Sequence, residues 1–147
     1  MTTVILVRHA DIDLPPLSDD PPLNSAGRER AETLAHVAGG AGVTTIFTSV
    51  FTRTKQTVGP LATRLGLGPS EAPPPPVLAS QVLSGSLGQV VVVAGHSNTV
   101  PQIIDAFGGP ASVPVIGERE FDNLYVVTTG VPGEAILVRL KYGDRSV

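Results

Sequence analysis

The chain has 147 residues, which fits one ordinary domain over residues 1–147 with a core large enough to fold without disulfides. It has no cysteine, which excludes thiolate metal sites, and its ten Lys and Arg against thirteen Asp and Glu give a net charge of −3. The basic residues form no stripe for nucleic acid, and no apolar run reaches the roughly 20 residues of a membrane helix. We therefore expect a cytoplasmic protein with no nucleic-acid or membrane partner and leave its oligomeric state open.

The first elements of the chain are predicted from apolar pattern and capping residues. Met1–Val7 contains a continuous β-branched apolar run, typical of a strand buried on both faces of a parallel sheet. Asp11–Pro22 is rich in Asp and Pro and predicts a surface loop. Asn24 or Ser25 is then the candidate N-cap of a helix that ends at Gly39-Gly40. The small and apolar residues on one face of this helix are Gly27, Ala31, Leu34, Ala35 and Ala38.

A second strand and a second helix follow. Thr44–Thr48 predicts a short strand, and a helix is expected to start near Phe51 and to end at Gly66. Pro60 inside this helix is expected to kink or divide it, because proline clashes with the carbonyl four residues earlier. The apolar face of the helix consists of Val58, Leu61, Ala62 and Leu65.

The middle of the chain combines a proline-rich segment with another buried strand. Gly66–Pro76 predicts a loop or an extended spacer, and Val77–Leu87 predicts a short helix. Val90–Ala94 is five apolar residues in a row and predicts a buried strand. A helix is expected over Thr99–Phe107, ended by Gly108-Gly109.

Two further strands close the pattern. Leu124–Thr128 and Ala135–Leu140 predict a hairpin, with residues 129–134 as its loop. Strands that alternate with helices and then a hairpin indicate an α/β fold, with a largely parallel sheet covered by helices and an antiparallel strand at one edge.

Ligands of such sheets bind just beyond the carboxyl ends of the parallel strands. In this sequence, arginine and histidine side chains follow the predicted strands at these ends. Arg8 and His9 follow the first strand, Arg53 lies shortly after the second, and His96 follows the third. A neutral imidazole is a good nucleophile near pH 7, and arginines bind phosphoryl oxygens bidentately. The start of the helix Thr99–Phe107 adds backbone donors behind His96. The pattern therefore predicts phosphoryl transfer at one crevice.

The same stretches resemble the histidine phosphatase superfamily, also called phosphoglycerate mutase-like, and especially its short SixA-like bacterial branch. The resemblance extends from residue 3 to about residue 128 and implies a three-layer α/β/α sandwich. It also implies an enzyme without metal or other cofactor, in which His9 is phosphorylated and then dephosphorylated by water, while Arg8, Arg53 and His96 form the phosphate pocket. The matching segments are residues 4–10, 23–28, 47–49, 53–57 and 93–99.

The two residues after His96 are further candidates for the phosphate pocket. Ser97 is not surrounded by the Gly-x-Ser-x-Gly pattern of a serine nucleophile, so we expect it to cap the following helix. Asn98 is expected either to cap the same helix or to touch the substrate. Both are included in the predicted phosphate site.

The general acid of the resembled family is usually a carboxylate between its second arginine and second histidine, and here that segment offers only Glu71. Asp11, two residues beyond the nucleophile, is the preferred candidate, because the end of the first strand fixes its position. Glu118, Glu120 and Asp122 are expected to form a solvated loop, from which Glu120 could approach the pocket.

The predicted function is hydrolysis of phosphate monoesters through phosphohistidine on His9. The substrate is a phosphorylated small molecule or a phosphorylated protein side chain, and the sequence does not decide which. One alternative is a phosphomutase, although mutases of this family carry insertions that close over the substrate, and the segment between Arg53 and His96 is short. A second alternative is a non-catalytic module that binds phosphorylated ligands, but such a module is expected to lack His9.

Overall fold

The computed structural model describes residues 1–108, 112–131 and 133–146. Gly109, expected to help end a helix, and Pro132 of the expected hairpin loop lie outside the described residues. The helices and strands, in chain order, are β1 Thr2–Arg8, α1 Ser25–Ala38, β2 Thr45–Thr48, α2 Thr52–Leu65, β3 Ser70–Glu71, α3 Pro75–Leu83, β4 Val90–Gly95, α4 Thr99–Ala106, β5 Asn123–Thr129 and β6 Ile136–Lys141.

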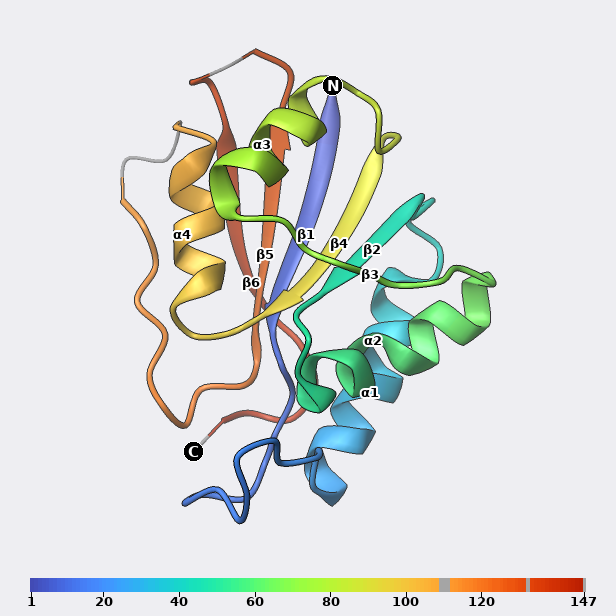
Figure 1. Cartoon of the computed structure of the whole chain (residues 1–147), viewed down its shortest axis with the longest axis vertical. Helices are drawn as coiled ribbons and strands as arrows, with labels where there is room; N and C mark the ends of the chain where they lie inside the picture. The colour runs from blue at the N-terminus through green and yellow to red at the C-terminus, as the bar shows by residue number, and fades with distance from the viewer. Residues whose placement is uncertain (109–111, 132, 147) are drawn as a thin grey trace.

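The strands form one sheet in the order β3-β2-β4-β1-β5-β6 (Figure 1). Strands β1, β4, β2 and β3 are parallel to one another, whereas β5 pairs antiparallel with β1, and β6 antiparallel with β5. The predicted α/β fold, mostly parallel with antiparallel pairing at one edge, is confirmed. In the β1–β4 ladder Arg8 is the partner of Gly95, so that His9 and His96 leave the sheet side by side.

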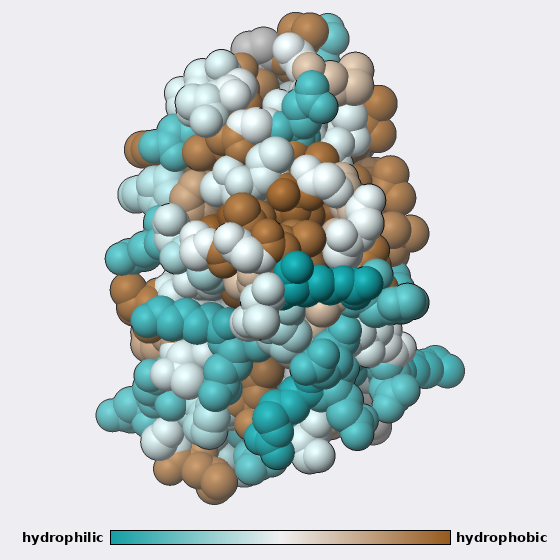
Figure 2. Space-filling view, turned by 90° about the vertical axis from the view of Figure 1, so that its right-hand side faces the viewer, coloured by the Kyte–Doolittle hydropathy of each residue, from teal (hydrophilic) through white to brown (hydrophobic). Residues whose placement is uncertain are grey.

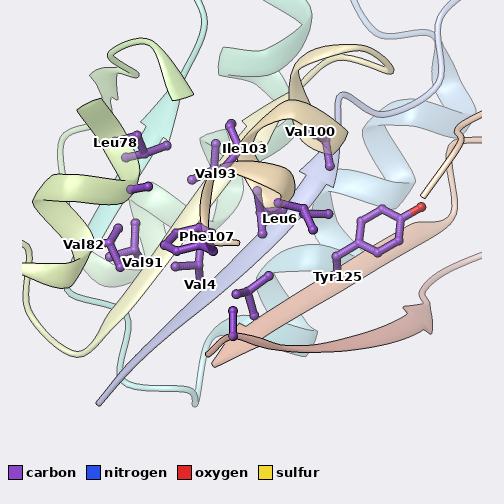
Figure 3. Close-up of a cluster of buried hydrophobic side chains, with 14 of the residues drawn as sticks. Val4, Leu6, Leu78, Val82, Val91, Val93, Val100, Ile103, Phe107 and Tyr125 are labelled. Carbon is purple, nitrogen blue, oxygen red and sulfur yellow. The ribbon is translucent and has the colours of Figure 1, made fainter. Parts of the chain in front are cut away.

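Two helices cover each face of the sheet and complete the three layers (Figure 1). On one face, Leu34 of α1 and Leu61 of α2 pack in a core with Ile46 of β2. On the opposite face, Leu78 of α3 and Ile104 of α4 belong to a second core, part of which is shown in Figure 3. Each fully buried side chain of this size contributes about 1.5–3 kcal/mol to folding.

The two cores explain the continuous apolar run of β1. Successive residues of a strand point to opposite faces of the sheet. Val4 and Leu6 therefore lie in the core under α3 and α4 (Figure 3), while Ile5 and Val7 lie in the core under α1 and α2. Polar side chains gather over the lower half of the face in Figure 2, the half where α1 and α2 lie in Figure 1.

The predicted ends of two helices are confirmed. Asn24 is the N-cap of α1, and its Oδ1 accepts a hydrogen bond of 2.9 Å from Gly27 N. Gly66 is the C-cap of α2 in the left-handed conformation, with φ of 66°. The expected division of α2 at Pro60 is wrong, because the helix continues from Thr52 to Leu65 with its apolar face buried in the core on both sides of the proline.

The proline-rich segment differs from the prediction in two respects. The expected loop contains a short strand, β3, whose residue Ser70 pairs with Phe47 of β2. Helix α3 starts at Pro75 instead of Val77, because a proline in the first helical turn lacks only an N–H that would have no partner in the helix. It ends at Leu83, four residues before the expected end, and Gly85 beyond it has a φ of 78°.

Candidate active site

The carboxyl ends of β1, β2 and β4 lie at one edge of a pocket of about 500 Å³. The segments that follow these strands, or begin the next helix, supply most of its polar lining. The structure thus brings together six of the predicted site residues, namely Arg8, His9, Arg53, His96, Ser97 and Asn98.

His9 is held rigidly at the end of β1 and is only 3% exposed. Its backbone N donates to Gly95 O at 2.8 Å, and its Nδ1 lies 2.8 Å from Ala10 O. Since a carbonyl oxygen can only accept, Nδ1 carries the proton, and Nε2 of the neutral ring is left with a free electron pair. Burial, aided by the charge of Arg8, lowers the pKa of His9 to about 3. At neutral pH the ring therefore carries no charge, and its Nε2 is nucleophilic.

Thr57 of α2 fixes the backbone just after His9. Its buried hydroxyl accepts a hydrogen bond of 2.8 Å from Ala10 N and donates one of 2.7 Å to Arg53 O. The backbone next to His9 and that of Arg53 are therefore tied to the same turn of α2. Thr57 belongs to a segment that resembles the family, but its spacing in sequence gives no sign of this contact with a residue 47 positions earlier.

Arg8 is 6% exposed and anchors the segment before β5 to the site. Its Nη1 donates to the carbonyl oxygens of Gly117, Glu118 and Glu120 at 3.1, 2.8 and 3.0 Å. The guanidinium group also lies over the ring of Phe121, 4.4 Å from its centre. Its Nε is buried without a hydrogen-bond partner among the described residues.

Arg53, in the first turn of α2, presents a second donor of this kind. Its Nη1 is buried and has no hydrogen-bond partner in the described part of the chain, and the nearest carboxylate oxygen, of Asp20, is 3.9 Å away. Asp20 itself accepts from the backbone N and the hydroxyl of Thr52 at 2.9 and 2.7 Å. Buried guanidinium N–H groups are costly to leave unpaired, so Arg8 Nε and Arg53 Nη1 are suited to bind an anion.

His96 faces His9 across the pocket, with ring centres 5.5 Å apart. Its Nε2 lies 2.8 Å from Ser49 Oγ, which in turn lies 2.8 Å from Thr54 Oγ1. Burial and then the charge of Arg53 lower the pKa of His96 to about 4. Both histidines of the pocket are therefore neutral at pH 7, and the positive charge comes from the two arginines.

The start of α4 corrects the prediction for Ser97. The N-cap position is Asn98, and its side chain makes no capping hydrogen bond. Thr99 Oγ1 instead accepts from His96 N at 2.9 Å. Because α4 begins at Thr99, Ser97 lies one residue too early to cap it, and both Ser97 and Asn98 line the pocket.

Asp11, the predicted general acid, is turned away from the His9 pocket. Its Oδ1 and Oδ2 accept from Arg30 Nε and Nη2 at 2.7 and 3.3 Å, and it lines a separate groove instead of the His9 pocket. Arg30 is 4% exposed and also donates to Tyr142 O at 2.7 Å. Burial of this arginine requires a counter-charge, so Asp11 is turned toward α1.

Three other carboxylates are placed differently from what the sequence suggests. Glu71 lies in β3 and is exposed on a neighbouring groove that reaches His96 but not His9. Glu118, expected in a solvated loop, lines the His9 pocket. The hydrogen bonds from Arg8 bring it there, and nothing in the local sequence indicates them. Glu120 does not line the pocket, because its carboxylate accepts from Gly117 N and Asn123 Nδ2 at 3.0 and 3.1 Å.

The described residues show neither a metal-binding cluster nor a membrane-spanning helix. Among residues 1–108, 112–131 and 133–146, no three His, Asp or Glu side chains gather as they would around a metal ion. None of the helices in the described ranges has the length and apolarity to cross a membrane.

Comparison with known proteins supports the assignment of family. The model of the histidine phosphatase superfamily (branch 1) matches residues 4–73, which contain His9 and both arginines. No curated protein matches the chain. The family match thus covers the first part of the chain, which holds His9, Arg8 and Arg53, and the fold agrees with it.

Solved structures match the fold over almost the whole chain. The protein histidine phosphatase SixA in complex with tungstate has 19% identity and a TM-score of 0.76, covering 95% of this chain and 97% of that one. Mycobacterial glucosyl-3-phosphoglycerate phosphatase has 15% identity and a TM-score of 0.77, covering 96% and 99%. A variant of phosphoserine phosphatase from Entamoeba histolytica in complex with phosphoserine has 13% identity and a TM-score of 0.70, covering 94% and 95%.

Proposed function

We propose that the protein is a phosphatase that hydrolyses phosphate monoesters through a phosphohistidine intermediate on His9. One observation carries this proposal. The unprotonated Nε2 of His9 lies in a pocket with two buried guanidinium donors, Arg8 Nε and Arg53 Nη1, which have no partner among the described residues. This combination provides a nucleophile and the charges that a phosphoryl group requires.

In the first step, the phosphoryl oxygens bind the two arginines, and His9 Nε2 attacks phosphorus opposite the ester oxygen. The P–N bond forms as the P–O bond breaks, and the electron pair of that bond leaves with the alcohol oxygen. The hydrogen bond from His9 Nδ1 to Ala10 O stabilises the positive charge that develops on the ring. Water then attacks phosphorus, the P–N bond breaks, and orthophosphate leaves.

The leaving oxygen also needs a proton. Neither Asp11 nor Glu71 lines the His9 pocket, and the two carboxylates that do, Asp19 and Glu118, lie on its exposed walls, so we assign this proton to water. Water is a weak general acid, so a basic alkoxide leaves slowly, whereas a stabilised phenolate leaves without being protonated. Nitrophenyl phosphate is therefore expected to be a better substrate than simple alkyl phosphates.

Hydrolysis fits the chain better than the two alternatives. The three structural neighbours described above are phosphatases by name. The pocket is walled by short segments, and exposed residues such as Asp19 and Glu118 form part of its lining, so water can reach a phosphorylated His9. A binding module would have no use for a buried imidazole with a free Nε2.

The direct test is covalent labelling. Wild-type protein incubated with radiolabelled substrate and quenched rapidly is expected to carry an acid-labile label, and His9→Ala is expected to lose both label and turnover. His36→Ala is the matched control, because His36 is exposed on α1 away from the pocket. Turnover that survived in His9→Ala would require another nucleophile.

Metal independence is tested separately. We expect nitrophenyl phosphate hydrolysis to persist in a metal chelator, because Arg and His supply every proposed charge contact. Loss of activity on chelation and its return with a divalent cation would contradict this mechanism.

A further inference from the structure

The His9 pocket has two zones of opposite charge. Only four of the described lining residues carry a formal charge: Arg8 and Arg53 beside the histidines, and Asp19 and Glu118 on the exposed walls. We call the part of the pocket beside Arg8 and Arg53 the inner zone, and a bound phosphoryl group neutralises its positive charge. The rest of a substrate must then pass the two carboxylates, and the described lining offers it no further basic side chain.

The backbone beside each of these exposed carboxylates is anchored by a hydrogen bond to another part of the chain. The carbonyl of Glu118 accepts from Arg8 Nη1 at 2.8 Å, so this residue is fixed directly beside the inner zone. Asp19 precedes Asp20, whose carboxylate is bound to the backbone and the hydroxyl of Thr52 at 2.9 and 2.7 Å. The two carboxylates therefore come from separate segments of the chain, Asp19 from the loop after β1 and Glu118 from the segment before β5.

The place of the anion is indicated independently of these carboxylates. Arg8 is 94% buried, and its Nε lacks a partner in the described part of the structure while the residue lines the pocket. An anionic ligand atom is therefore expected at the inner zone, with the remainder of the ligand directed outward.

We propose that Asp19 and Glu118 select phosphate esters that carry a cationic group next to the phosphate and disfavour those that carry a second anion. This inference rests on the proposed function and names its substrate class. A cation within a few ångströms of the carboxylates is attracted, and an anion is repelled, most strongly at low salt. A cationic group next to a phosphate ester occurs both in small amine-bearing phosphates and in phosphorylated side chains flanked by Lys or Arg.

Three non-hydrolysable phosphonates isolate this effect from catalysis. In 2-aminoethylphosphonate, propylphosphonate and 3-phosphonopropionate an ammonium, a methyl or a carboxylate group stands two carbons from phosphorus. As competitive inhibitors of nitrophenyl phosphate hydrolysis, they are expected to bind in that order, about tenfold apart between the first and the last, with the difference shrinking at 0.5 M salt. Equal inhibition constants, or the reverse order, would overturn the proposal.

Variants assign the effect to the two walls. Asp19→Asn and Glu118→Gln are each expected to reduce about threefold the ratio of the inhibition constant of 3-phosphonopropionate to that of 2-aminoethylphosphonate. The double variant is expected to bring this ratio close to one. Asp13→Asn is the matched control, because Asp13 is an exposed carboxylate of the same loop that does not line the His9 pocket. A ratio that stayed unchanged in the double variant, or fell equally in Asp13→Asn, would refute the assignment.

Substrates then distinguish the two sources of a cation. A phosphoserine peptide with Lys neighbours is compared with its Glu-flanked counterpart, and aminoethyl phosphate with phosphoglycolate. Preference for the cationic member in either pair supports the proposal and identifies the source, whereas no preference in both pairs contradicts it.

If nitrophenyl phosphate is not hydrolysed, the proposed function fails, but charge selection can still be tested. Binding of the three phosphonates is then measured by calorimetry. The same order of affinity upholds charge selection, and equal or absent binding overturns it.

Discussion

At the scale of single residues, the site depends on one imidazole that is neutral because it is buried. His9 shares its pocket with Arg8 and Arg53, yet the first cause of its low pKa is the loss of solvent, to which the charge of Arg8 adds. The same burial and the hydrogen bond to Ala10 O fix the ring with Nε2 free. In the proposed mechanism, His9 therefore needs no base to deprotonate it before it attacks phosphorus.

The pH dependence of the activity follows from this state. The pKa of His9 is about 3 and that of His96 about 4, so both rings stay unprotonated as the pH falls from 7 to 5. We expect kcat/KM for nitrophenyl phosphate, corrected for ionisation of the substrate, to change less than twofold over this range. An acidic limb with a midpoint near pH 6.5 would show that the histidines titrate as they do in water.

Asp11 illustrates how a residue close to a nucleophile in sequence can serve another purpose. Its side chain is 16% exposed and pairs with the buried guanidinium of Arg30. Removing one partner of such a pair leaves the other charge buried without compensation.

We therefore expect Asp11→Asn to lower the free energy of unfolding by about 3 kcal/mol. Hydrolysis of alkyl and nitrophenyl phosphates should change by the same factor, since Asp11 does not line the pocket. Urea unfolding and kinetics on both substrates check this, and Asp13→Asn, at an exposed position, is the control with little effect on stability. A selective loss on alkyl phosphates would restore Asp11 as the general acid.

At the scale of elements, the segment after β1 is held between two helices. Thr57 of α2 accepts a hydrogen bond from Ala10 N, and Gly27 of α1 lies against the backbone of Asp11. A Cβ on Gly27 would overlap Asp11 O and lie 2.9 Å from Asp11 N. The glycine thus allows α1 to approach the chain that positions the nucleophile.

Alanine at two helical glycines tests this close approach. Gly→Ala inside a helix ordinarily stabilises by about 0.5–1 kcal/mol. In Gly59→Ala of α2 the added Cβ meets no atom within 4 Å apart from its chain neighbours and its own helix backbone, so we expect a stabilisation below this amount, since the following Pro60 disfavours a Cβ in the helical conformation. Gly27→Ala should instead destabilise by about 2 kcal/mol and reduce kcat, because backbone next to the nucleophile must move. Thermal unfolding and nitrophenyl phosphate kinetics measure both effects. Equal stabilisation by the two variants would mean that α1 is not packed this closely.

At the scale of the whole molecule, the sheet gathers histidines and arginines at one end and buries them there. The strand order β3-β2-β4-β1-β5-β6 places the ends of β1 and β4 next to each other. The proposed function thus requires a neutral, buried pair of histidines, and their burial affects the stability of the fold.

Stability is therefore expected to fall in mild acid. The folded-state pKa values of His9 and His96, about 3 and 4, lie below the ordinary value of 6.5, so the unfolded chain binds more protons below pH 6.5. The free energy of unfolding should fall from pH 6.5 toward pH 4, by at most about 1.4 kcal/mol per pH unit for each histidine. Urea titrations at several pH values would measure it.

Substitution identifies the groups responsible for this dependence. His9→Ala and His96→Ala should each make the slope shallower, whereas His36→Ala should leave it unchanged, because His36 is exposed at the end of α1. A free energy of unfolding that stayed constant from pH 6.5 to 5 in the wild-type protein would contradict the burial of neutral histidines.

The sequence by itself determined the features that depend on neighbouring residues. Apolar runs predicted β1 and β4, because a strand buried on both faces must be apolar at every position. Asn24 and Gly66 were predicted as helix ends, because capping is a local hydrogen-bonding or conformational requirement. The positions of Arg8, His9 and His96 after parallel strands were sufficient to place them at one edge of the sheet.

Only the tertiary structure decided where individual carboxylates point. Asp11 is turned to Arg30 of α1, and Glu118 is brought to the pocket by a hydrogen bond between residues 110 positions apart. Strand β3, two residues long, likewise exists only because β2 provides its partner. Periodicity and spacing describe a chain along its length, whereas the direction of a charged side chain is set by the partners that compensate its burial, and the fold brings these from distant parts of the sequence.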